Sequence, residues 1–371
     1  MLATLRAGLA VGARPRAVAE GGFHIASLDG VRALAALLVF VGHAGLGDVV
    51  PGGFGVTLFF FLSGYLITTL LRRELEQTGG ISLRNFYLRR VYRIFPPLYL
   101  VLTLLVVLAL TGVTKNPMQP MAVLAQYAHL TNYYLVAWGS VDTAPVVPFT
   151  VPMWSLAVEE HFYLLFPLAL LFLRRQVSRP TAALVLALAC GAVLLWRCVL
   201  IFALHADWIY TYHATDTRID SLLFGCIMGI WWNPALDKPP ARMTGFFWLM
   251  ACAAAAGLLA FTFLYRSEEF RETLRYSLQG LALFPLFYCA VRYHRLPVFA
   301  WLDTRPMRFL GLISYTFYLS HEACIVLTGK WLDDQGIARA AAGFALTVAF
   351  SSASYLLIEQ RMARLRRRLH G

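Results

Sequence analysis

The sequence is poor in charged residues. Only 14% of its 371 residues are charged, whereas 59% are hydrophobic, and the mean hydropathy is +0.63. An ordinary soluble domain carries about 25% charged residues. This shortage argues against a soluble globular protein and indicates that the lipid bilayer is the solvent of most of the chain.

Cysteine is also scarce. The six cysteines all fall within apolar runs and form no CxxC pair; they are Cys190, Cys198, Cys226, Cys252, Cys289 and Cys324. This pattern argues against a disulfide framework and against a zinc site. We interpret these residues as small packing side chains, and we predict no metal site.

Several organising features are missing as well. The first 20 residues contain three arginines but no apolar core typical of a signal peptide, so we interpret residues 1–26 as a cytoplasmic leader. The net charge of +12 could suit nucleic acid, but no binding module is present, so no nucleic-acid partner is predicted. No linker or repeat divides the remainder. We therefore predict one membrane domain over 27–358 and a basic cytoplasmic tail over 359–371.

Apolar stretches of about 20 residues, the length that crosses a bilayer, are abundant. Ten of them lie at approximately 27–47, 54–71, 94–112, 154–173, 181–204, 218–233, 243–264, 276–293, 309–329 and 339–358. They predict an all-α membrane protein with about ten transmembrane helices in one bundle. We expect a multi-pass protein of the inner (plasma) membrane.

The basic residues are distributed unequally between the two sides of this bundle. Of the 32 Lys and Arg residues, 23 fall in the termini and the connections on one side, 7 on the other, and 2 within spans. Because cytoplasmic loops carry the excess of Lys and Arg, both termini should be cytoplasmic. The tail RMARLRRRLHG is expected to anchor beside anionic lipid headgroups.

Ionisable residues within the spans are candidate site residues, since each is costly in lipid. The first span carries Arg32 and, eleven residues further on, His43, which lies about 16 Å deeper. The fourth span has Glu159 and Glu160 near its outer end, so we expect Glu159 at a depth similar to that of His43. A histidine and a carboxylate would form a general base. The alternative is a buried histidine bonded only to backbone or water.

Two outer groups are candidates for binding a substrate. In the sixth span, Arg218 lies between Asp216 and Asp220, which predicts either a structural ion pair or a sugar-binding clamp. In the ninth span, Tyr318 and His321 could bond an acceptor, and packing is the alternative.

A basic cluster precedes the third span on the cytoplasmic side. It consists of Arg89, Arg90 and Arg93 in FYLRRVYRIFPPLYL. If this segment is helical, Arg89 and Arg93 share a face. Guanidinium groups bind phosphates bidentately, so a phosphorylated nucleotide such as coenzyme A is a suitable ligand. The alternative is topogenic charge that contacts lipid headgroups.

The sequence resembles the acyltransferase-3 family of membrane proteins, which includes O-acetylases of surface polysaccharides and exopolysaccharides and acyltransferases of macrolides. The motifs that carry the resemblance span most of the chain: LDGVRALAALLVFVGHA, GVTLFFFLSGYLI, FYLRRVYRIFPPLY, WSLAVEEHFYLLFP, TRIDSLLFG and ISYTFYLSH. The resemblance implies ten helices with a cytoplasmic N-terminus. It also implies a cytoplasmic acyl-CoA donor, most commonly acetyl-CoA, and an acceptor on the far side of the membrane.

The resemblance also implies site residues. His43 matches the family's essential histidine, Arg32 its paired arginine, and Glu159 the acid of the SLxxExxFY pattern. The basic loop of the family matches Arg89, Arg90 and Arg93. His161 stands where glutamine is more usual. Many relatives carry an additional extracytoplasmic domain after the membrane part, whereas this sequence ends soon after its last span. We therefore expect transfer to be completed within the bundle or on a separate protein.

We therefore predict a membrane O-acyltransferase in which His43 deprotonates the acceptor and Glu159 orients the imidazole. The acyl-CoA donor is expected on Arg32, Arg89, Arg90 and Arg93. The acceptor is a carbohydrate, a glycolipid or a macrolide-like molecule, and no cofactor is bound permanently.

Three alternatives remain at this point. The first is a transporter or flippase of a glycan or lipid precursor, which the absence of paired broken spans disfavours. The second is a haem-binding electron carrier that uses His43 and His321. The third is a multispanning acyltransferase of the MBOAT type, which fits the motifs poorly.

Overall fold

A computed structural model describes residues 25–114, 118–238, 245–332 and 336–367. The described residues form helices and turns and contain no strand. The predicted all-α class is therefore confirmed. Nearly all of the predicted leader, and residues 368–371 of the predicted tail, lie outside the described residues.

Long helices occur at all ten positions that the apolar stretches predicted. They are α2 (Ala26–Val41), α3 (Gly52–Thr78), α4 (Leu83–Leu110), α7 (Trp154–Gln176), α8 (Arg179–Phe202), α10 (Thr215–Ile230), α11 (Gly245–Leu264), α13 (Leu274–Arg292), α15 (Arg305–Leu332) and α16 (Ile337–Ser354). Within the described chain, eight helices are long and apolar enough to span a membrane. The other two are α10 and α13, with 16 and 19 residues. The count of ten crossings stays a prediction.

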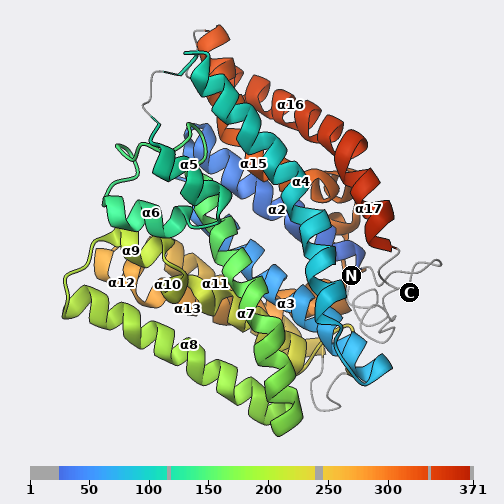
Figure 1. Ribbon diagram of the computed structural model, residues 1–371. Helices are drawn as coiled ribbons and strands as arrows, with labels where there is room; N and C mark the ends of the chain where they lie inside the picture. The colour runs from blue at the N-terminus through green and yellow to red at the C-terminus, as the bar shows by residue number, and fades with distance from the viewer. Residues whose placement is uncertain (1–24, 115–117, 239–244, 333–335, 368–371) are drawn as a thin grey trace.

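Short helical elements connect or extend the long ones. They are η1 (Gly42–Leu46), α5 (Pro120–Tyr127), α6 (Thr131–Trp138), η2 (Val151–Met153), α9 (Trp208–His213), α12 (Glu268–Glu272), α14 (Pro297–Ala300), η3 (Trp301–Asp303), η4 (Tyr355–Glu359) and α17 (Gln360–Arg367). The start of α2 and the end of α17 lie on the same side of the bundle (Figure 1). This agrees with an even number of crossings, although the cytoplasmic side stays a prediction.

The segment that carries the basic cluster is helical rather than a loop. α3 continues to Thr78 and ends at Gly79, whose positive φ of 75° terminates the helix. The Ser82 side chain then accepts a hydrogen bond from the backbone N–H of Asn85 and caps α4. Because α4 begins at Leu83, its arginines occupy defined positions on a helix surface instead of an extended loop.

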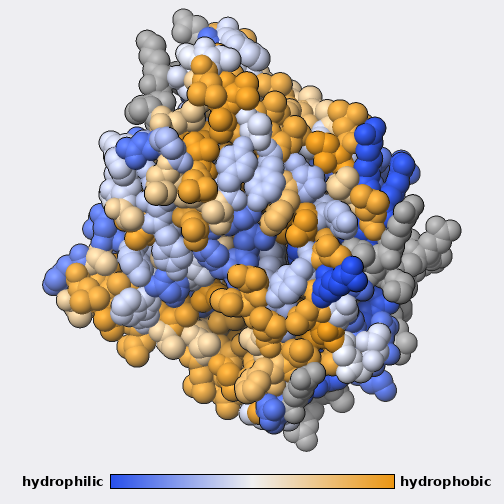
Figure 2. Space-filling model, in the orientation of Figure 1, coloured by the Kyte–Doolittle hydropathy of each residue, from blue (hydrophilic) through white to orange (hydrophobic). Residues whose placement is uncertain are grey.

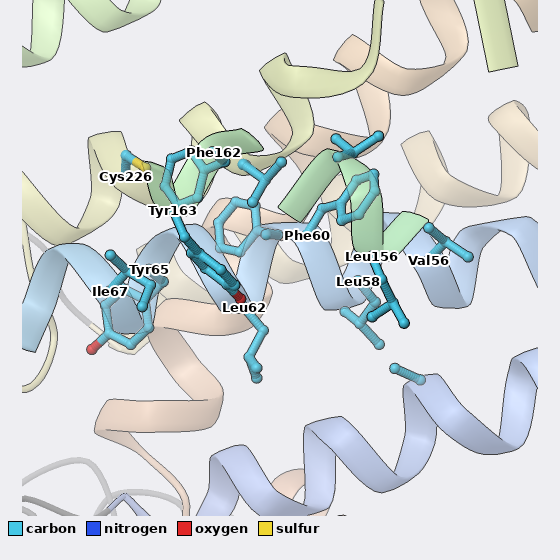
Figure 3. Close-up of a cluster of buried hydrophobic side chains, with 14 of the residues drawn as sticks. Val56, Leu58, Phe60, Leu62, Tyr65, Ile67, Leu156, Phe162, Tyr163 and Cys226 are labelled. Carbon is cyan, nitrogen blue, oxygen red and sulfur yellow. The ribbon is translucent and has the colours of Figure 1, made fainter. Parts of the chain in front are cut away.

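α3 lies at the centre of the bundle and α10 packs directly against it. The membrane-spanning window of α3 is 78% buried, whereas that of α11 is 17% buried and so is exposed to lipid. Side chains of α3 such as Phe60 and Tyr65 lie beside Phe162 and Tyr163 of α7 (Figure 3). On the face shown in Figure 2, apolar side chains cover large areas of the surface, as contact with lipid chains requires.

Glycines set the close approach of α3 and α10. A Cβ on Gly64 would lie 1.9 Å from the carbonyl oxygen of Leu222, and a Cβ on Gly225 would lie 2.0 Å from that of Phe61. Small residues that let backbones touch are the usual means of helix association in lipid. This contact accounts for the glycines in SGYL of α3 and LFGC of α10, two segments that face each other in the core.

We predict that Gly64→Ala destabilises the folded protein by at least ~1–3 kcal/mol, because backbone atoms cannot move away from the added methyl group. Thermal unfolding of the detergent-solubilised protein measures the loss. Gly257→Ala, in lipid-exposed α11 where nothing lies within 4 Å of the added carbon, is the matched control and should be neutral. Equal stability of the two variants would contradict the proposed packing role of Gly64.

Candidate active site

His43 lies on a widened turn at the end of the first long helix. α2 passes directly into the π-helical segment η1, where Gly45 has a φ of 103° that a side chain would disfavour. The imidazole is exposed. Single π turns inside helices occur frequently at functional sites. The small residues of GHAGL thus allow a turn that presents His43 outward from the helix.

A second histidine contacts His43. Nε2 of His321, on α15, lies 3.3 Å from Nδ1 of His43. Nδ1 of His321 lies 2.6 Å from the carbonyl oxygen of Tyr318, and Nδ1 of His43 lies 2.9 Å from that of Val39. His321 itself is buried. Two residues that the sequence assigned to different roles therefore form one pair.

The carboxylate associated with this pair is Glu322. It follows His321 on α15 and interacts electrostatically with His43. This acid is not among the site residues predicted from the sequence. The available signal was the HE dipeptide itself, because a second ionisable residue beside a buried histidine within a span is costly.

Glu159 does not contact His43 in this structure, contrary to the expectation from depth. Its carboxylate accepts a hydrogen bond from the Tyr163 hydroxyl at 3.1 Å, and that hydroxyl lies 2.5 Å from the Ser63 hydroxyl oxygen. Ser63 was expected to be only a small packing residue. The three side chains form a hydrogen-bonded chain between α3 and α7, in which Ser63 and Tyr163 are buried and Glu159 is partly buried.

The start of α7 explains the difference in depth. Ser155, in the first turn of α7, bonds Tyr318, which is one turn from His321 on α15. Glu159 is four residues further along α7 and so lies about 6 Å closer to the opposite face. The side chain that reaches the histidine level from α7 is therefore a serine.

Tyr318 holds two helices together. Its hydroxyl donates to the carbonyl oxygen of Pro152 at 2.7 Å and lies 2.7 Å from the Ser155 hydroxyl oxygen. The hydroxyl thus has two partners at the start of α7, and the side chain is buried. Its geometry is that of an anchor between α15 and α7 rather than of a group facing an acceptor.

The predicted donor arginines separate into two groups. Arg89 forms an ion pair with Glu74 at 2.9 Å. Arg90 and Arg93 instead face the interior, where both interact electrostatically with Glu159. The remaining arginine, Arg32, pairs with Asp29 at 2.9 Å.

Arg90 is enclosed by aromatic rings. Its guanidinium carbon lies 5.4 Å from the ring centroid of Tyr163 and 5.6 Å from that of Phe86. Its Nε has no hydrogen-bond partner among the described residues. Glu160 interacts with it electrostatically. Arg90 therefore has hydrogen-bonding capacity that no described side chain fills.

The polar side chains of the interior lie at two levels. One level contains His43, His321 and Glu322, and the other contains Arg32, Arg90, Arg93, Glu159 and Tyr163. Along α2 the two levels are about 16 Å apart, from His43 to Arg32. Hydrophilic side chains also gather in a hollow at the middle of one face, between α4 and α7 (Figure 2). The bundle thus has a polar interior across much of its thickness.

Arg218 is not part of an acidic clamp. Its side chain is fully buried, and it donates hydrogen bonds to the Tyr212 carbonyl oxygen at 3.1 Å and to the Thr57 hydroxyl at 3.3 Å. Four rings surround the guanidinium carbon, those of Tyr276 at 3.9 Å, Tyr212 at 5.2 Å, Trp154 at 5.4 Å and Phe60 at 5.7 Å. Aromatic faces stabilise this cation.

Asp220 pairs with Arg197 of α8 instead. The two side chains are 2.8 Å apart and both are 0% exposed. Arg197 also donates to the carbonyl oxygens of Thr273 and Thr217 and to the Ser277 hydroxyl. This pairing was not predicted, because a single sequence does not show which helices are neighbours.

Within the described residues, no group of three or more His, Cys, Asp or Glu side chains could hold a metal ion. The six cysteines are free thiols. The candidate site itself is composed of imidazole, carboxylate, hydroxyl and guanidinium groups.

Comparison with known proteins gives a family for this arrangement. A family model described as an acyltransferase domain matches residues 25–356. The chain is similar to the peptidoglycan O-acetyltransferase OatA of Listeria monocytogenes, with 27% identity over 91% of this chain and 55% of that protein. It is also similar to the O-acetyltransferase OatA of Staphylococcus aureus, with 29% identity over 83% of this chain and 52% of that protein.

The chain spans about half of the length of these relatives. No solved structure matches it.

We predict that Asp220→Leu alone destabilises the protein by ~3–5 kcal/mol, because it leaves the Arg197 cation buried without its anion. The double variant Arg197→Met with Asp220→Leu should recover much of the loss, since no unpaired charge remains. Thermal unfolding in detergent compares the three proteins. If Asp220→Leu is as stable as the wild type and only acceptor binding weakens, Asp220 belongs to a substrate site instead.

Proposed function

We propose a specific reaction from one premise, that this chain belongs to the acyltransferase domain family and is an acyltransferase of a multi-pass membrane type. The reaction is transfer of an acetyl group from cytoplasmic acetyl-CoA to a hydroxyl of a cell-wall carbohydrate at the outer side of the bacterial plasma membrane. The names of the two relatives support the acetyl group and the glycan acceptor.

The observation that carries the proposal is the pair of polar levels within one bundle. Arg90 and Arg93 supply positive charge at one level, and Arg90 has an Nε without a partner among the described residues. Phosphate groups suit such guanidinium groups because charge-assisted hydrogen bonds are the strong ones. An exposed histidine lies at the other level. A ligand with phosphates at one end and a thioester at the end of an extended arm fits both.

The chemistry assigned to His43 is general base catalysis. Its imidazole removes the proton of the acceptor hydroxyl while the hydroxyl oxygen attacks the thioester carbonyl carbon. The new C–O ester bond forms, the C–S bond breaks, and the thiolate of coenzyme A takes the proton from the imidazolium. Glu322 stabilises the imidazolium by charge. Glu159, which was expected beside the imidazole, instead interacts with Arg90 and Arg93 in this proposal.

The reaction is tested on glycans from matched cells with and without the gene. Mass spectrometry of the isolated cell-wall glycans should show a gene-dependent mass increase of one acetyl group, which mild base should remove because it is an ester. Unchanged acetylation combined with a changed amount of exported glycan would instead support the transporter or flippase alternative.

We predict that His43→Ala lowers the rate of acetyl transfer by ~10²–10⁴-fold, the usual contribution of a positioned general base. Membrane insertion and thermal stability should change little, because the side chain is exposed. The measurement is release of coenzyme A by purified protein in nanodiscs with acetyl-CoA and muropeptides. Turnover within twofold of the wild type would refute the assignment.

We predict that the double variant Arg90→Gln with Arg93→Gln raises the KM for acetyl-CoA, and that the remaining affinity depends less on salt because the lost interaction is largely Coulombic. Arg84→Gln is the matched control, since Arg84 lies on the same helix but is exposed. An unchanged KM in the double variant would show that these arginines serve only membrane topology.

A further inference from the structure

We propose that His321 is a positioning residue that holds the imidazole of His43 in one tautomer and one orientation. The proposal rests on the proposed function, in which His43 is the general base. It replaces the acceptor-binding role that the sequence predicted for His321, and it gives the ninth long helix a part in the chemistry.

The hydrogen-bond partners determine the tautomers of both rings. A carbonyl oxygen can only accept, so Nδ1 of His43 must carry the proton in its bond to Val39. For the same reason Nδ1 of His321 must carry the proton in its bond to Tyr318. The 3.3 Å contact between the rings joins Nδ1 of His43 to Nε2 of His321. Nε2 of His321 is therefore the unprotonated acceptor in that contact.

This assignment leaves Nε2 of His43 as the nitrogen that can accept a proton. Nδ1 of His43 is occupied by two acceptors, the Val39 oxygen and His321, whereas no described group bonds Nε2. The same nitrogen takes the proton of the acceptor hydroxyl and then delivers it to the departing thiolate, so no proton is left over. Orientation of an imidazole by a hydrogen bond at the opposite nitrogen is a known requirement of such bases.

The hydrogen-bonded chain is anchored at its far end. His321 is 1% exposed, and the residue that supplies its carbonyl acceptor, Tyr318, is fixed through its hydroxyl to Pro152 and Ser155 at the start of α7. His321 therefore has little freedom to rotate. A buried ring with both nitrogens bonded can hold a neighbouring exposed ring, whereas the reverse is not possible.

Two charged groups accompany this pair from the packed helices. Glu322 on α15 interacts with His43, and Nη2 of Arg339 on α16 would lie 3.6 Å from a Cβ on Gly45 in the same widened turn. Both stay in place when residue 321 alone is changed. A change of rate in such a variant then reports on the contact between the rings.

Three variants test the proposal. His321→Leu keeps the approximate volume but removes the acceptor for His43. His321→Gln retains an oxygen that can accept from His43 and an N–H that can donate to Tyr318. His213→Leu is the matched control, because His213 is 2% exposed, its Nδ1 also bonds a carbonyl oxygen of its own helix at 2.9 Å, and burial lowers its pKa to about 4 so that it is also neutral.

The proteins are compared in nanodiscs with acetyl-CoA and muropeptides. We expect His321→Leu to lower kcat by about 10- to 100-fold with little change in either KM, since a misplaced base costs rate rather than binding. His321→Gln should recover most of kcat, and His213→Leu should retain it. Wild-type kcat in His321→Leu, or a raised KM for muropeptides alone, would overturn the proposal and favour packing or acceptor binding respectively.

Nitrogen-15 NMR of histidine-labelled protein gives a readout that does not depend on activity. His43 and His321 should both be protonated at Nδ1 and unprotonated at Nε2 near neutral pH, and the shift of the His43 nitrogens should change in His321→Leu. A proton on Nε2 of His43 would overturn the proposal. A wild type that has the expected tautomers but transfers no acetyl group would refute the proposed function and leave the tautomer assignment intact.

Discussion

The cost of an unpaired polar group in lipid is the constraint on which this bundle depends. Water cannot solvate side chains in the hydrocarbon region, so each must find its partners within the protein. The constraint accounts for the Arg197 and Asp220 ion pair and for the enclosure of Arg218 by aromatic rings. Against that background, atoms that keep unused hydrogen-bonding capacity are informative. Nε of Arg90 is one of several buried side-chain atoms without a hydrogen-bond partner in the described chain, and it lies where a ligand phosphate is proposed to bind.

The sequence predicted the helical class, the positions of the ten long helices and the identities of several interior polar residues. These features depend on composition and on local apolar patterns, which one sequence contains. The relation between His43 and Glu159 could not be read from the sequence, because it depends on where α7 begins relative to α2. Four residues along a helix correspond to about 6 Å. That distance places Ser155, and not Glu159, near the depth of the two histidines.

Pairing between helices was the least predictable feature of the site. Arg218 and Asp220 are two residues apart, so they point to different sides of α10 and meet different partners. Asp220 reaches α8, whereas Arg218 reaches rings contributed by other helices. On α4, Arg89 pairs with Glu74, whereas Arg90 and Arg93 interact with Glu159. Neighbouring positions in sequence indicate a common depth in the membrane, but rotation about the helix axis decides the partner.

The two π turns within the described residues have a consequence for how helix faces are oriented. Besides η1 at His43, the segment η4 ends at Glu359, which accepts a hydrogen bond from Thr316 at 2.7 Å. A π turn holds one residue more than an α turn, so it offsets the helical phase on its two sides. The segment η4 therefore offsets the faces of α17 from those of α16. The one extra residue of this turn helps to set the direction in which the arginines of α17 point relative to α16.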